Sequence, residues 1–179
     1  DWFKKTLKFA KKDNAKNWLF KEHPANKFYK TLDLNLNKLM KKLPSHVKFI
    51  SANDNIKTTT VLNMADVIVT CLGSAGMEMP ALKKIPSIIT SKSFYSGFGF
   101  TIEPKSKEEY FNILENISFK RITSRQQLIA KACYLYIMKY TSVPFAAGPS
   151  VAIEDILRPQ KLQKKYFKCI LDCYNKKSN

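Results

Sequence analysis

The order of apolar and polar positions along the chain predicts alternating strands and helices. Short apolar runs have the length of strands, and apolar residues between them recur every three or four positions, as in helices. The run 67–72 has the unbroken apolar character of a strand that is covered on both faces in a parallel sheet. The predicted strands are 18–20, 47–50, 67–72 and 86–90, and the predicted helices are 2–10, 31–43, 57–65, 75–84, 106–116, 123–140 and one that begins at Pro159.

Capping signals support two of these helices. Ser106 with Glu109, and Thr123 with Gln126, have the spacing of capping boxes. The segment 93–101, rich in glycine and aromatic residues, is too irregular to assign to a strand or a helix.

Strands that alternate with helical crossovers predict the α/β class, with a right-handed, parallel, Rossmann-like sheet, flanking helices and further helices at the C-terminus. We expect a single domain over residues 1–179, with its core at about 17–120 and the C-terminal helices at about 123–177. Ligands of such sheets bind at the carboxyl ends of the strands. The segments 21–24 and 73–78 follow predicted strands and are therefore the candidate sites.

The segment 73–78 joins a predicted strand to a helix through Gly73, Ser74, Ala75 and Gly76. Small residues let a ligand approach the backbone, and the amides at a helix start favour a phosphate. Ser74 could cap the helix or donate its hydroxyl to that phosphate, and Glu78 could be a surface carboxylate or accept from ribose hydroxyls. An ordinary turn remains the alternative, since the pattern is neither GxGxxG nor a P-loop.

The segment 21–24 places two opposite charges and an imidazole where a strand ends. Pro24 favours an extended conformation at His23 and so aims its side chain. His23 could donate to a phosphate oxygen, act as an acid for a leaving phosphate, or be structural. His46 lies in a turn and is expected to be solvated.

The chain is strongly basic, with 31 Lys and Arg against 14 Asp and Glu, a formal charge of +17. Residues 1–30 contain nine Lys against three acidic residues, and residues 158–179 are also basic. Such ends attract polyanions, anionic lipid and phosphorylated substrates, although AT-rich coding would also enrich Lys. Nucleic acid is disfavoured as a partner, because Arg is scarce and no basic repeat is flanked by aromatic residues.

Four cysteines without CxxC spacing and two histidines predict no metal site. Free thiols fit a reducing cytosol, so we expect a cytoplasmic protein. No run approaches the roughly 18 apolar residues of a membrane span, and no leader opens the chain. Because the first residue is Asp1, we expect a processed chain or a piece of a longer one.

A series of short motifs follows in order over residues 17–105. They are Lys21-Glu22-His23-Pro24, Val47-Lys48-Phe49-Ile50, Ala65-Asp66-Val67-Ile68-Val69-Thr70, Gly73-Ser74-Ala75-Gly76-Met77-Glu78, Lys84-Ile85-Pro86 and Tyr95-Ser96-Gly97-Phe98. In order and spacing this series resembles the nucleotide-binding half of bacterial capsule polysaccharide synthesis glycosyltransferases. It is similar to the group that includes Kdo transferases, and more distantly to sialyltransferases with an HP motif.

The resemblance implies one half of a GT-B fold, in which two Rossmann-like domains face each other across a cleft. It also implies that His23, fixed by Pro24 and accompanied by Lys21, contacts the nucleotide phosphate. In the second segment, Gly73, Ser74 and the amides of Ala75 and Gly76 would hold the same phosphate, and Glu78 would meet the ribose or base. No catalytic base is assigned, although Glu22 is the nearest candidate.

The resemblance therefore predicts an enzyme domain that binds a nucleotide-activated sugar, with a CMP-sugar favoured, and needs no cofactor or metal. Its further partners would be a glycan or lipid-linked acceptor, a missing N-terminal domain and, through the basic ends, the inner face of an anionic membrane. One alternative is a CDP-glycerol-type polyol phosphotransferase. Another is a non-catalytic basic module that binds a polyanion or a membrane surface, with a steep dependence on salt.

Overall fold

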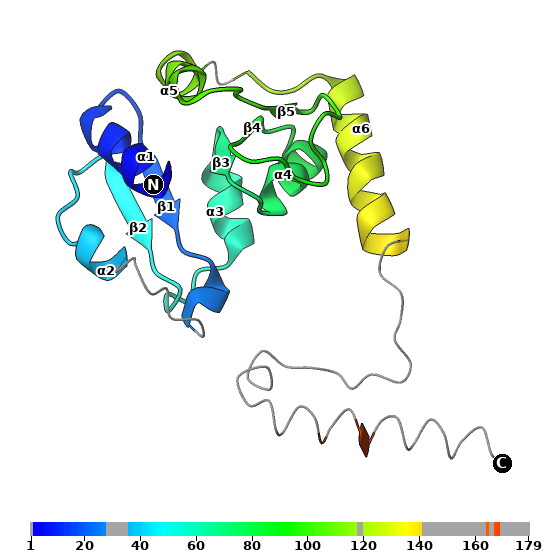
Figure 1. Cartoon of the computed structure of the whole chain (residues 1–179), viewed down its shortest axis with the longest axis horizontal. Coiled ribbons are helices and arrows are strands. Elements are labelled where there is room, and N and C mark those ends of the chain that lie inside the picture. The colour runs from blue at the N-terminus through cyan, green and yellow to red at the C-terminus, as the bar shows by residue number, and fades with distance from the viewer. Residues whose placement is uncertain (1, 28–35, 118–119, 141–163, 165–166, 169–179) are drawn as a thin grey trace. The chain divides into compact units, whose positions relative to one another are not determined.

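The computed structural model describes residues 2–27, 36–117, 120–140, 164 and 167–168 (Figure 1). The described residues through Tyr140 fall into two compact units, one within residues 2–56 and the other within residues 57–140. Both units combine short parallel strands with helices, which confirms the α/β class. None of the helices in the described ranges is long and apolar enough to cross a membrane.

The first unit contains one parallel pair of strands. Its described elements are α1 (Trp2–Lys12), β1 (Trp18–Lys21), the 3-10 turn η1 (Pro24–Lys27), α2 (Leu36–Leu39) and β2 (Val47–Ile50). The strands pair in register from Trp18 opposite Val47 to Lys21 opposite Ile50. Helix α1 buries Leu7 and Ala10, which are 4% and 0% exposed, and leaves most of its lysines in solvent.

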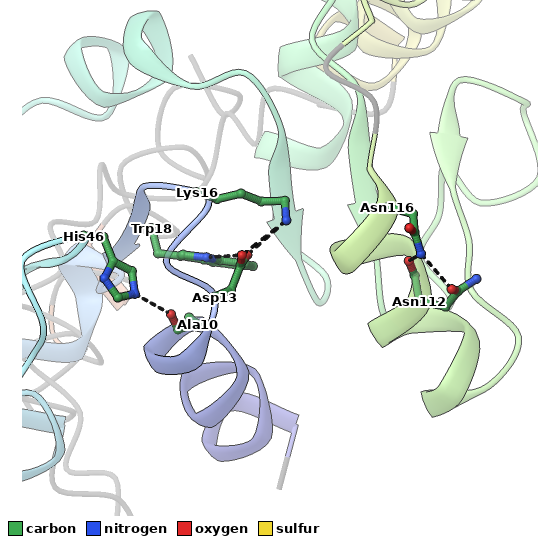
Figure 2. Close-up of polar contacts among 7 residues, drawn as sticks. All are labelled: Ala10, Asp13, Lys16, Trp18, His46, Asn112 and Asn116. Carbon is green, nitrogen blue, oxygen red and sulfur yellow. Dashed lines mark hydrogen bonds and ion pairs between the residues drawn. The ribbon is translucent and has the colours of Figure 1, made fainter.

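Helix α1 is attached to β1 through aromatic rings. Phe3 meets Phe20 edge-on with centroids 5.7 Å apart, and Phe9 meets Trp18 in the same way at 5.9 Å. Asp13, just after the helix, accepts a hydrogen bond from the Trp18 indole at 3.1 Å (Figure 2). These contacts orient the helix along the strand pair.

His46 completes this attachment, so the expectation that it is solvated was wrong. Its half-buried ring places Nε2 3.0 Å from the Ala10 carbonyl oxygen (Figure 2). The last turn of a helix leaves carbonyl groups without intrahelical partners, and an imidazole N–H satisfies one of them here. Because a carbonyl oxygen can only accept, this hydrogen bond requires a proton on Nε2 of His46.

The second unit contains a three-stranded parallel sheet. Its elements are α3 (Thr58–Met64), β3 (Ile68–Thr70), α4 (Ala75–Lys83), β4 (Ser87–Ile89), β5 (Thr101–Ile102), α5 (Lys107–Asn116), α6 (Ser124–Leu135) and a π-helical turn, η2 (Tyr136–Tyr140). The strand order is β3-β4-β5, and β4 is fully buried between its neighbours. All four predicted strands form, but they belong to two separate parallel sheets, where one sheet was expected. Pairing depends on residues far apart in sequence, which a local pattern does not report.

Strand β5 was not predicted, because two residues are too few to establish an alternating pattern. The predicted helix at 31–43 is described only at 36–39, and residues 28–35 lie outside the described part of the chain. The helix predicted from Pro159 also begins outside it. Helix α6 ends at Leu135 as an α-helix and continues as the π turn, where an α-helix through Tyr140 was expected.

Helix α4 packs against the sheet and against α6. Met77 and Ala81 of α4 are buried with Ile89, Phe100 and Ala130 in one apolar cluster. The C-terminal carbonyl groups of α4 accept hydrogen bonds from the segment that leads into α6: Lys83 from Arg121, Lys84 from the Ile122 amide, and Ala81 from Gln127. The end of α4 is thereby capped by a segment about 40 residues later in the chain.

The capping box of α6 yields a stability prediction. The Thr123 hydroxyl accepts from the Gln126 amide at 3.2 Å, and the Gln126 side chain accepts from the Thr123 amide at 2.9 Å. Thr123→Ala should lower the free energy of unfolding by about 1 kcal/mol, because the Gln126 amide loses its partner. Urea unfolding measures this, and Thr123→Ser, which keeps the hydroxyl, serves as the control. Equal losses in the two variants would contradict the prediction.

Candidate functional site

The carboxyl ends of β3 and β4 lie at the same edge of the second unit's sheet, because these strands are parallel neighbours. Their ladder extends one step further, where the Thr90 amide donates to the Thr70 carbonyl at 3.1 Å. The turn 71–74 leaves β3 at this edge and leads into α4. The loop 90–100 leaves β4 at the same edge, so the candidate turn has a second loop beside it.

Three hydrogen bonds determine the form of the turn. The Gly73 amide donates to the Thr70 hydroxyl at 3.1 Å, and the Gly76 amide donates to the Gly73 carbonyl at 3.0 Å. The Tyr95 hydroxyl, from the neighbouring loop, donates to the same Gly73 carbonyl at 2.7 Å. The amides of Gly73 and Gly76 are therefore used inside the protein.

The amides of Ser74 and Ala75 have no hydrogen-bond partner among the described residues. They lie at the start of α4, where the helix dipole favours an anion. Ser74 itself is exposed, has helical backbone angles of φ −56° and ψ −25°, and makes no capping hydrogen bond through its side chain. Ser74 was expected either to cap the helix or to donate its hydroxyl to a phosphate. It does not cap the helix, and its side chain is accessible to a ligand.

Gly76 is buried for a reason internal to the fold. A Cβ at this position would overlap the Tyr95 hydroxyl and would approach the Thr70 Cγ2 to 3.0 Å. Glycine here permits close contact between α4 and Tyr95. The role of Gly76 is therefore structural: it leaves room for the Tyr95 ring against the turn.

Tyr95 is fully buried and links the two loops of this edge. Burial raises the pKa of its hydroxyl above the ordinary value for tyrosine. The phenol therefore stays protonated at neutral pH, which the donated hydrogen bond to Gly73 requires.

Two charged residues accompany the turn. Glu78, half-buried in the first turn of α4, interacts favourably with the helix dipole, and its carboxylate has no hydrogen-bond or ion-pair partner among the described residues. Lys92 is exposed in the loop after β4 and forms no ion pair within the described chain. Sequence reasoning missed Lys92, because it is one of many lysines and only the strand pairing places it at this edge.

The other predicted segment, 21–24, belongs to the first unit and is described by itself. Glu22 is a structural acceptor there: one carboxylate oxygen accepts from the Ala52 amide at 2.9 Å, and the other accepts from the Asn26 side chain at 3.3 Å. It ties the loop after β2 to the end of β1. Each carboxylate oxygen of Glu22 therefore accepts one structural hydrogen bond and keeps a second lone pair.

His23 is exposed and directly precedes η1, which begins at Pro24. Its carbonyl accepts from the Asn26 amide at 2.9 Å, so this tight turn sets the backbone at His23. Lys21 is half-buried, and its ammonium donates to the Glu22 carbonyl at 3.4 Å. The two predicted groups of site residues thus lie in different units.

Within the described residues no group of three or more His, Cys, Asp or Glu could hold a metal ion. Comparison of the chain with protein-family models, curated proteins and solved structures finds no match.

The close contact between Gly76 and Tyr95 is testable. Gly76→Ala should lower the free energy of unfolding by about 1–3 kcal/mol, because the new methyl group collides with the phenol. In a Tyr95→Phe background, which removes the hydroxyl, the same substitution should cost measurably less. Gly97→Ala is the control: its Cβ would meet nothing within 4 Å, and its cost comes from the positive φ of 82°. If Gly76→Ala lowered the free energy of unfolding by the same amount in the wild type and in the Tyr95→Phe background, the contact would be refuted.

Proposed function

We propose that the β3–α4 turn binds a nucleotide phosphate and that the chain is the donor-binding domain of a glycosyltransferase. The observation that carries the proposal is the start of α4, where the Ser74 hydroxyl is exposed and the amides of Ser74 and Ala75 have no partner among the described residues. This is the arrangement in which backbone N–H groups and the helix dipole bind an anion. The donor would be a nucleotide-activated sugar, with a CMP-sugar favoured by the resemblance.

The chemistry proposed for the turn is electrostatic. When the bond between sugar and phosphate breaks, negative charge accumulates on the departing phosphate, and fixed donors aimed at that charge lower the barrier. Ser74, Ala75 and the Lys92 ammonium supply such donors at the carboxyl edge of the sheet. Glu78, one turn into α4, would accept hydrogen bonds from the ribose hydroxyls.

In the first unit we propose His23, set by Pro24, and Lys21 as further nucleotide-binding residues, as the resemblance implies. Neither Glu22 nor another residue is proposed as the catalytic base. A second GT-B domain would bring the acceptor, a glycan or lipid-linked saccharide, in the synthesis of a bacterial surface polysaccharide. We propose the cytoplasmic face of the membrane as the place of this reaction.

Calorimetric titration with CMP, CDP, UDP and GDP tests the proposal. One nucleotide should bind selectively, and Ser74→Ala should weaken it roughly tenfold, as expected when a hydrogen bond to a charged group is lost. His23→Ala should weaken it as well. Ser124→Ala, at the start of α6, is the matched control and should bind as the wild type does. A folded wild-type chain that binds none of the four nucleotides would refute the proposal, and preference for CDP-glycerol over CMP-sugars would favour the phosphotransferase alternative.

A second candidate function rests on helix α1. Lys4, Lys8 and Lys12 are exposed, lie four residues apart and so share one side of the helix, and form no ion pair among the described residues. Because the opposite side is buried through Leu7 and Ala10, this helix could not insert its apolar face into a bilayer without leaving its own core. It would bind an anionic surface through charge alone.

Vesicle binding distinguishes this candidate from the nucleotide site. If α1 attaches the chain to anionic lipid, replacing Lys4, Lys8 and Lys12 together by Gln should weaken binding to phosphatidylserine-containing vesicles roughly a hundredfold, at about 1 kcal/mol per Lys. Added salt should weaken the wild type in the same direction. The control replaces the exposed Lys105, Lys107 and Lys131 of the second unit. Equal losses in both triple variants would assign the binding to net charge and contradict a role for α1.

A further inference from the structure

The loop after β4 exposes two phenylalanines at the edge that carries the candidate phosphate turn. Phe94 is 58% exposed and Phe98 is 50% exposed, whereas Tyr95 and Phe100 in the same loop are buried. Exposed single phenylalanines are common on protein surfaces and need no special account. Phe94 and Phe98 differ from such scattered residues because hydrogen bonds fix the backbone of the loop that carries them.

Hydrogen bonds fasten the loop along its length. The Ser93 amide donates to the Ser96 hydroxyl at 2.8 Å, and the Gly97 amide donates to the Glu103 carboxylate at 2.8 Å. Further along, the Gln126 side chain of α6 donates to the Gly99 carbonyl at 2.9 Å. The exposed rings are thus presented by a segment whose backbone is tied to its neighbours.

The rings themselves form a chain of contacts. Phe94 meets Tyr95 edge-on, with centroids 4.9 Å apart and an interplanar angle of 88°. Tyr95 stacks with Phe100 at 6.1 Å, and Phe100 stacks with Phe98 at 6.5 Å. The buried pair in the middle supports an exposed ring at each end.

Phe94 is the exposed ring more directly joined to the candidate turn. It contacts Tyr95, and the Tyr95 hydroxyl donates to the Gly73 carbonyl at 2.7 Å. Phe98 reaches the turn only through Phe100 and then Tyr95. In a nucleotide, base and phosphate are separated by one ribose, so a ring that stacks on the base must lie close to the phosphate site.

We propose that Phe94 is the stacking surface for the base of the nucleotide whose phosphate binds at the β3–α4 turn. This inference rests on the proposed function and adds the position of the base to it. An aromatic ring stacks on any nucleobase, because every base has a π-face. Phe94 therefore contributes affinity, and the choice among bases comes from other contacts.

Alanine substitutions at the two exposed rings test the assignment. The probe is whichever of CMP, CDP, UDP and GDP the wild-type chain binds most tightly. Phe94→Ala should weaken it about five- to a hundredfold, the range for loss of one base–aromatic stack. Phe94→Tyr should bind within about twofold of the wild type, since it retains the aromatic face. Phe98→Ala is the matched control and should also remain within about twofold.

Phe94→Trp provides a readout separate from affinity. Its indole emission, measured against the wild type with Trp2 and Trp18, should be quenched by the nucleotide and not by inorganic pyrophosphate, which has no base. Suppose that Ser74→Ala weakens nucleotide binding. Phe94→Ala binding as tightly as the wild type, or Phe98→Ala losing as much affinity as Phe94→Ala, would then overturn the assignment of Phe94 and leave the phosphate site standing. A wild-type chain that binds no nucleotide would overturn the proposed function, and the Phe94 assignment with it.

Discussion

The hydrogen bond from the buried Tyr95 hydroxyl to the Gly73 carbonyl is the contact on which the candidate site depends. It joins the turn after β3 to the loop after β4 across the carboxyl edge of the sheet. Gly76 has no room for a Cβ because this phenol occupies the space, and the Tyr95 ring packs with the apolar cluster that holds α4 and α6. A tyrosine hydroxyl is protonated at neutral pH, and burial raises the pKa of this one further, so Tyr95 remains a hydrogen-bond donor.

This arrangement divides the turn into an inner and an outer part. Gly73 and Gly76 direct their amides into hydrogen bonds within the protein, whereas Ser74 and Ala75 leave theirs without partners among the described residues. An anion-binding turn needs both parts, because open donors bind well only when their positions are set in advance. The exposed Phe94 and Lys92 extend the outer part along the neighbouring loop, and they offer an aromatic face and a positive charge.

The first unit uses its polar residues mainly to fasten its own elements. Glu22 ties two loops, His46 satisfies the end of α1, and Asp13 accepts from the Trp18 indole. Each of these side chains is of a type that also occurs in catalytic sites, yet its contacts in this unit are structural. His23 and the α1 lysines Lys4, Lys8 and Lys12 are exposed, and the functional proposals for this unit concern them.

The sequence by itself determined the α/β class, the four longer strands and the cap of α6, because those signals depend on neighbours two to four residues away. The capping box at Thr123 and Gln126 forms as its spacing predicts. Tertiary structure decided how the strands pair, that Thr101 and Ile102 form β5, and that His46 meets Ala10. It also decided that Gly76 faces Tyr95 while Ser74 stays open, since each of these outcomes depends on residues that are distant in sequence and meet only after folding.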